Sequence, residues 1–247
     1  MKTDKFGEVF KTRGGRINEA KLSPFGAKNL THLTQIADSL VANAQGLKKP
    51  LSIQFGFIEN ASINACATRH DDEYFVGVHW GSVVMMDLTL SRILANRKAF
   101  TRIGDVNLET EDVPIITNFL PDAAYMFAAG NKIICPRDPV RQAYVTSLLL
   151  FAYRFLLGHE FAHVVYGHID LLIPNGRTAS LTELDITPID AKANLTRQVI
   201  EWDADCSAAS VHGAGYIRRR SESGSNDSAW SNNILIQVKR LMTGPQL

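Results

Sequence analysis

Hydrophobic residues at helical spacing predict a helix early in the chain. Ser23-Pro24 is a typical helix start, and Gly46 is a typical end. Between them, apolar residues recur every three or four positions and share one helix face: Leu30, Leu33, Ile36, Ala37, Leu40, Val41 and Ala44. This helix is expected to pack on a core. The polar residues 1–22 before it are expected to form a loosely ordered N-terminal arm.

An alternating pattern predicts strands after this helix. Residues 51–57 alternate apolar side chains with polar or small ones, which is the period-2 pattern of a half-buried strand. Two further strands are predicted at 62–68 and 73–80, on either side of the polar turn 69–72. These segments predict a small mixed sheet of about three strands.

Helical patterns return in the middle of the chain. Residues 82–98 predict a helix, and prolines break residues 103–121 into irregular sequence before a short helix at 123–129. Asp138-Pro139 is a typical start for the long apolar helix that runs to Tyr166, because proline fits the first helical turn.

The last part of the chain alternates loops and helices. Residues 168–195 contain several helix breakers and predict a long loop, a candidate wall of a cleft. A helix around 197–210 follows, and the polar residues 221–228 predict a linker to a final amphipathic helix at 230–242. Because no internal repeat or second set of chemical motifs is visible, residues 1–247 are predicted to form a single domain.

Composition narrows the class of protein. A length of 247 residues with 45% apolar and 21% charged residues is typical of a globular chain, and a net charge of +1 argues against nucleic acid as a partner. Cys66, Cys135 and Cys206 are widely spaced, which indicates reduced thiols and excludes a cysteine zinc ribbon. The chain begins with polar residues, and the apolar run 143–157 contains Arg154 and is too short for a bilayer span. A soluble, cytoplasmic protein without a membrane span is therefore expected.

The long apolar helix contains the motif His159-Glu160-Phe161-Ala162-His163. Residues four apart lie one turn apart on the same helix face, so His159 and His163 can bind one metal ion. Glu160 can reach a water on that metal and act as general base without being a ligand. The bare pattern also arises by chance, but these charges are costly inside an apolar helix unless a metal is their partner. The motif therefore predicts a zinc site.

A catalytic zinc normally has three protein ligands, so a third is expected downstream. On a continuous helix His168 would lie about 140° from His163, and it is interpreted as a helix-terminal histidine after Gly167. Glu201 and Asp205 lie one turn apart on an apolar helix, where two like charges need a positive partner. We predict Glu201 as the third ligand and Asp205 as the acceptor that orients a ligand imidazole.

The alternative for this second motif is a solvated acidic face. The large apolar neighbours Ile200 and Trp202 argue against that alternative for Glu201. Asp203, about 200° round the helix from Glu201, is expected to face water. His212 returns to the face of Glu201 and is a weaker prediction as an oxyanion stabiliser, with a buried structural histidine as the alternative.

The remaining histidines lack a motif. His32 is expected on a helix surface, and His70 and His79 are expected to be structural or solvated.

The two motifs together resemble those of the gluzincin zinc metallopeptidases. His-Glu-Phe-Ala-His followed by Glu-Trp-Asp-Ala-Asp is similar to the CAAX-prenyl-protease-like family and to the phage-exclusion Lit peptidases, over residues 158–210. The resemblance implies an α+β, zincin-like fold with the two motifs on adjacent helices of a helical core beside the sheet. It also implies the site residues: ligands His159, His163 and Glu201, base Glu160 and orienting Asp205.

A second resemblance concerns the predicted sheet. Residues 63–67 and 74–78 are similar to two strands of the prenyl-protease-like family, in which the sheet edge borders the cleft. This implies that an extended substrate pairs with an edge strand that consists of Asn64, Ala65, Cys66 and Ala67.

The leading hypothesis is a zinc-dependent endopeptidase with one zinc per chain. A metal-activated water, with Glu160 as general base, would hydrolyse peptide bonds of a protein or peptide substrate. The resemblance to Lit peptidases implies a role in phage exclusion. The alternative is a non-catalytic zinc-binding regulator that binds a partner protein. Glu160 favours the enzyme, because a purely structural metal has no use for such a base.

Overall fold

The computed structural model describes residues 4–22, 24–45, 50–109, 113, 134–172, 180–182 and 191–222. The chain divides into two compact units, residues 1–208 and 209–247, where the sequence predicts a single domain. The division falls inside the last described helix. Both motifs therefore belong to the first unit, to which the rest of this description applies.

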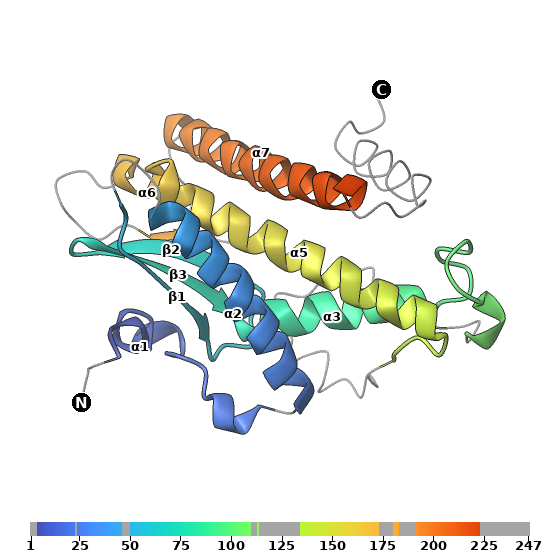
Figure 1. Ribbon diagram of the computed structural model, residues 1–247. Helices are drawn as coiled ribbons and strands as arrows, with labels where there is room; N and C mark the ends of the chain where they lie inside the picture. The colour runs from blue at the N-terminus through green and yellow to red at the C-terminus, as the bar shows by residue number, and fades with distance from the viewer. Residues whose placement is uncertain are drawn as a thin grey trace. The chain divides into compact units, whose positions relative to one another are not determined.

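The first unit is α+β, as predicted, with helices and strands that succeed one another along the chain (Figure 1). Short 3₁₀ turns connect some of them, at Lys11–Arg13, Glu19–Lys21 and Val106–Leu108. The main elements are α1 (Lys5–Val9), α2 (Pro24–Gln45), β1 (Ile53–Ile58), β2 (Ala65–His70), β3 (Glu73–His79), α3 (Trp80–Ala95), α5 (Pro139–Val165), α6 (His168–Leu171), β4 (Ser180–Thr182) and α7 (Ala191–Glu222), which continues into the second unit.

The predicted helices α2, α3 and α5 and the three predicted strands are confirmed, with boundaries that differ by a few residues. The predicted helices at 123–129 and 230–242 lie outside the described residues. The predicted linker 221–228 also lies outside them, except for its first two residues, which belong to α7.

The sheet is mixed and has the strand order β1-β3-β2-β4. β1 runs parallel to β3, and the other two pairs are antiparallel. The fourth strand, β4, comes from the segment predicted as a loop, because three residues are too few to show an alternating pattern. β4 pairs with β2 from Cys66↔Thr182 to Thr68↔Ser180, so β2 is an inner strand. The prediction of an open edge was therefore wrong for Cys66 and Ala67, while Asn64 and Ala65 lie before the residues that β4 pairs.

The N-terminal segment is packed rather than loosely ordered. Phe6 and Phe10 are buried against Ile58, Cys66 and Phe75 of the sheet. Two apolar side chains four positions apart were too few to outweigh the polar composition of residues 1–22 in the sequence pattern. Their burial fixes this segment to one face of the sheet, opposite the face that bears the motif helix.

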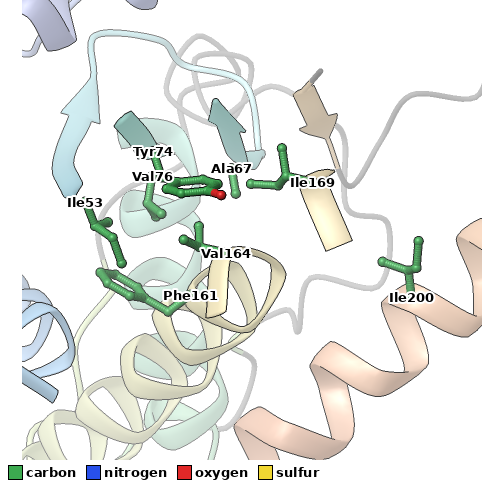
Figure 2. Packing of buried hydrophobic residues seen from close by; sticks show 8 residues of the cluster. All are labelled: Ile53, Ala67, Tyr74, Val76, Phe161, Val164, Ile169 and Ile200. Carbon is green, nitrogen blue, oxygen red and sulfur yellow. The ribbon is translucent and has the colours of Figure 1, made fainter. Parts of the chain in front are cut away.

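The core that positions the site lies between the sheet and the C-terminal half of α5 (Figure 2). Phe161 and Val164 of α5 point toward strand residues such as Ala67 and Val76. Phe161 and Val164 occupy the face of α5 that packs on the sheet. By the helical repeat, His159 and His163 lie on a different face of α5, which points away from this core. Ile169 of α6 and Ile200 of α7 complete the same core cluster.

The N-terminal end of α5 is fixed by a buried arginine. The Asp138 side chain caps the helix by accepting a hydrogen bond from the Arg141 amide at 2.8 Å. The Arg141 side chain is fully buried, and its Nε lies 3.6 Å from Oε1 of buried Glu109. Its guanidinium donates to five backbone carbonyls in the last turn of α3 and the segment after it: Leu94, Asn96, Ala99, Phe100 and Ile103. This single side chain therefore joins the start of α5 to residues 94–103, at and after the end of α3.

Helix α5 is also, among the described residues, the one helix long and apolar enough to cross a membrane. Within the folded chain, 56% of its most apolar window is buried, and the core helices of water-soluble proteins share this property.

Candidate metal centre

Three potential metal ligands meet between α5 and α7. His159 and His163 lie one turn apart on α5, and Glu201 lies on α7. The two Nε2 nitrogens are 3.0 Å apart, and Oε2 of Glu201 lies 3.1 Å from that of His159 and 3.4 Å from that of His163. Among the described residues, this is the one group of His, Cys, Asp and Glu side chains close enough to hold a metal ion.

The spacing of these donor atoms fits a tetrahedral zinc ion. With zinc–ligand bonds of about 2.0–2.2 Å, neighbouring corners of a tetrahedron lie about 3.3–3.6 Å apart. The three observed distances, from 3.0 to 3.4 Å, are near this range. A set of two histidines and one glutamate also leaves the fourth corner open, which is the arrangement of catalytic rather than structural zinc sites.

The other ring nitrogen of His159 is held by Asp205. Nδ1 of His159 lies 2.9 Å from Oδ1 of Asp205, one helical turn after Glu201. An ionised carboxylate only accepts hydrogen bonds, so Nδ1 carries the proton and the lone pair of Nε2 faces the other donors. Asp205 therefore lies beside the second ring nitrogen of His159, the position from which it is predicted to orient this ring.

The other ring nitrogen of His163 is held differently. Its Nδ1 lies 3.1 Å from Nδ1 of His168, and Nε2 of His168 lies 3.1 Å from Oδ2 of Asp203. The interpretation of His168 as a helix-terminal histidine missed this contact. The angle of about 140° assumes a continuous helix, but α5 ends before Gly167, whose φ of 72° redirects the chain. Asp203 is half-exposed, as expected, but it also accepts from His168.

Burial differs across the site. The side chains of the three histidines are almost inaccessible, whereas Glu201 is 32% exposed. Burial raises the pKa of Glu201, but the adjacent rings of His159 and His163 outweigh this effect and bring the pKa down to about 2. Glu201 is therefore an ionised donor at any pH at which histidine can bind a metal.

The electrostatics of His168 also agree with its hydrogen bonds. Burial and the neighbouring His163 lower the pKa of His168 below its usual value, despite the opposing effect of Asp203. The ring is therefore neutral near neutral pH, and one of its nitrogens can accept.

One argument for the third ligand was wrong in part. Of the two apolar neighbours of Glu201, Ile200 is buried, but Trp202 is 68% exposed. Glu201 faces His159 and His163 because of its helical phase relative to Ile200, while Trp202 projects into solvent.

Glu160 is fully buried directly after His159 on α5. The effect of its charge reaches β2, where burial and Glu160 together raise the pKa of Cys66 to about 12. Cys66 is therefore a neutral thiol near neutral pH and a poor metal ligand or nucleophile. Glu160 remains the candidate base, outside the group of three donors.

The predicted substrate strand has no free side chains for a substrate. Ala65, Cys66 and Ala67 are fully buried. Asn64 is used structurally, because its Oδ1 accepts from the Ala65 amide and its own amide donates to Ser82.

The other histidines are structural or peripheral. Nδ1 of His79 lies 2.7 Å from the Ser62 hydroxyl, and burial lowers the pKa of His79 to about 4. His70 lies 3.7 Å from Asp71 at the exposed end of β2, and His32 is half-buried on α2. The side chain of His212 lies outside the described residues, so its role as an oxyanion stabiliser stays a prediction.

The purified protein is expected to hold about one zinc ion per chain, measured by plasma emission spectrometry after gel filtration. His163→Ala and Glu201→Ala should each lose most of it, because a three-ligand site that loses one ligand binds weakly. His70→Ala, an exposed histidine, is the matched control and should keep full zinc. Full zinc in Glu201→Ala together with loss in His168→Ala would assign the third ligand to His168 instead.

Asp205→Asn should weaken zinc binding by about 10- to 100-fold without removing a ligand, because the side chain orients His159 through its second nitrogen. Competition with a chromogenic chelator measures this affinity. A dissociation constant equal to that of the wild type would show that the contact between Asp205 and His159 does not act on the metal.

Comparison with protein-family models, with curated proteins and with solved structures finds no match to this chain. The resemblance to gluzincins therefore rests on the two motifs and on the donor geometry alone.

Proposed function

We propose that the chain is a zinc-dependent endopeptidase that hydrolyses peptide bonds of a protein substrate. The observation that carries the proposal is the near-tetrahedral spacing of His159, His163 and Glu201, next to a buried carboxylate that is not part of the donor group. A purely structural site usually has four protein ligands, whereas three protein ligands are typical of a catalytic one.

Each residue has a distinct role in this proposal. Zinc, when bound, would polarise a substrate carbonyl and lower the pKa of water to about 7. Glu160 would accept the proton of the attacking water and then pass it to the departing amine nitrogen. Burial of Glu160 keeps competing solvent away from the proton transfer. Asp205 would hold the His159 ring in the orientation that points Nε2 to the metal.

Exposed apolar side chains near the site support a protein as substrate. Leu195, Val199 and Trp202 recur at helical spacing on α7 and are each more than half exposed. Tyr166, at the end of α5, is also exposed and accepts a hydrogen bond from Ser207 of α7. Apolar side chains gathered at a surface typically mark a site of protein contact. The role in phage exclusion that the Lit resemblance implies stays a prediction.

The test is a proteome-wide search for new protein N-termini in cells that express the wild type or His159→Ala. The proposal expects a small set of new N-termini with the wild type alone, because His159→Ala loses the metal. Identical sets from the two proteins would contradict it. A wild type that holds zinc but yields no new N-terminus would favour the alternative, a zinc-binding regulator.

A further inference from the structure

The two ligand histidines are supported in different ways. Nδ1 of His159 meets a carboxylate directly, whereas Nδ1 of His163 meets a second imidazole, that of His168. The second imidazole then reaches Asp203. We call His163, His168 and Asp203 the His168 network.

The protons of the His168 network can be placed from the acceptor at its end. Asp203 only accepts, so a neutral His168 carries its proton on Nε2 and donates to Oδ2 of Asp203. Nδ1 of His168 is then an acceptor, and the bond at 3.1 Å requires the proton on Nδ1 of His163. This leaves the lone pair of His163 Nε2 facing the other two donors. The network thus selects the one tautomer of His163 that can bind the metal through Nε2.

His168 is held in place independently of the metal. Gly167, directly before His168, turns the chain with a φ of 72°. Ile169, directly after His168, is fully buried in the core. Asp170 accepts hydrogen bonds from the Tyr74 hydroxyl at 2.7 Å and from Arg69 at 3.0 Å. Helix α6, which carries His168, is therefore fixed to β2 and β3 by contacts that involve none of the three metal donors.

We propose that His168 is a positioning residue of the metal centre: it accepts from His163, is held by Asp203, and thereby fixes the ring of His163 for metal binding. His168 is not itself a ligand in this proposal. It lies on the Nδ1 side of His163, whereas the other two donors lie on the Nε2 side. Accordingly, the group of donors that could hold an ion does not include it.

The inference rests on the metal centre of the proposed function and not on peptide hydrolysis, so it is tested by metal binding. His168→Phe keeps a buried ring but removes the acceptor, while His168→Asn places a carbonyl oxygen near the position of Nδ1. We expect His168→Phe to raise the zinc dissociation constant by about 10- to 100-fold. His168→Asn should recover most of the zinc affinity that His168→Phe loses. If His168 only filled space in the core, His168→Phe would instead bind zinc more tightly than His168→Asn. Asp203→Ala should also weaken zinc binding, but by less, because Asp203 is half-exposed.

Cobalt provides the second measurement. At saturating Co²⁺, the visible absorption bands of His168→Phe should match those of the wild type, because the ligands are unchanged and only the affinity falls. Bands that report a changed coordination number would make His168 a ligand and overturn the proposal. Equal zinc affinities for wild type and His168→Phe would also overturn it. If His168→Phe does not fold by circular dichroism, unchanged affinity in Asp203→Ala decides against the network. A wild type that binds neither zinc nor cobalt removes the metal centre and this inference together, whatever its proteolytic activity.

Discussion

Glu160→Gln should abolish proteolysis while the zinc content stays at the level of the wild type. The substitution preserves the size of the side chain but removes its ability to accept a proton from the attacking water. Loss of a general base typically lowers the rate by about 10²- to 10⁴-fold. Because Glu160 lies outside the group of three donors, the metal should remain bound. The measurement is the rate at which a purified substrate, identified from its new N-terminus, is cut by each protein.

The control for this prediction makes the same chemical change elsewhere. Glu19→Gln exchanges an exposed carboxylate for an amide and should cut at the rate of the wild type. A cellular effect that survives in Glu160→Gln but vanishes in His159→Ala would show that the metal-bound protein acts by binding. The peptidase proposal would then be replaced by the regulator.

Arg141→Ala should lower the free energy of unfolding by about 3–5 kcal/mol, because it removes one partner of a buried ion pair. The remaining carboxylate of Glu109 would keep its hydrogen bonds to the amides of Arg137 and Asp138 but would lose its counter-charge. In addition, the carbonyls of Leu94, Ala99 and Ile103 would lose the hydrogen bond from Arg141, whereas those of Asn96 and Phe100 would keep a backbone amide as donor. Urea denaturation of the metal-free protein measures the change without a contribution from zinc.

A neighbouring arginine offers the control for this substitution. Arg137 is exposed, and Arg137→Ala should change the unfolding free energy by about 0.5 kcal/mol or less. Arg141→Lys keeps the charge but loses the planar set of donors. Its change in unfolding free energy should therefore lie between those of Arg137→Ala and Arg141→Ala. A change below about 1 kcal/mol in Arg141→Ala would mean that solvent reaches the carbonyls and replaces the guanidinium.

The residues that the sequence predicts best are those whose geometry a single helix determines. His159 and His163 follow from the helical repeat alone. Glu201 and Asp205 could be predicted because two like charges one turn apart on an apolar helix need a shared positive partner. The predictions for the donor group and for the contact between Asp205 and His159 agree with the structure for that reason.

The features that the sequence did not predict depend on contacts between distant segments. His168 was assigned by its angle on a continuous helix, but Gly167 ends that helix and changes the direction of the next residue. The pairing of β4 with β2 joins segments more than one hundred residues apart, and the hydrogen bond between Tyr74 and Asp170 joins residues 96 positions apart. The pairing of Arg141 with Glu109 likewise leaves no periodic pattern in the sequence.

The turn at Gly167 also defines a longer search pattern for related proteins. Written out, the site becomes His-Glu-x-x-His-x-x-x-Gly-His together with Glu-x-Asp-x-Asp. The glycine is required because a left-handed backbone favours it, and the last histidine and the middle aspartate are required because they bind each other. A chain that loses one of that pair should often lack the other, so the two positions are expected to vary together. Such linked variation would identify distant relatives that the short zinc motif alone does not separate from chance.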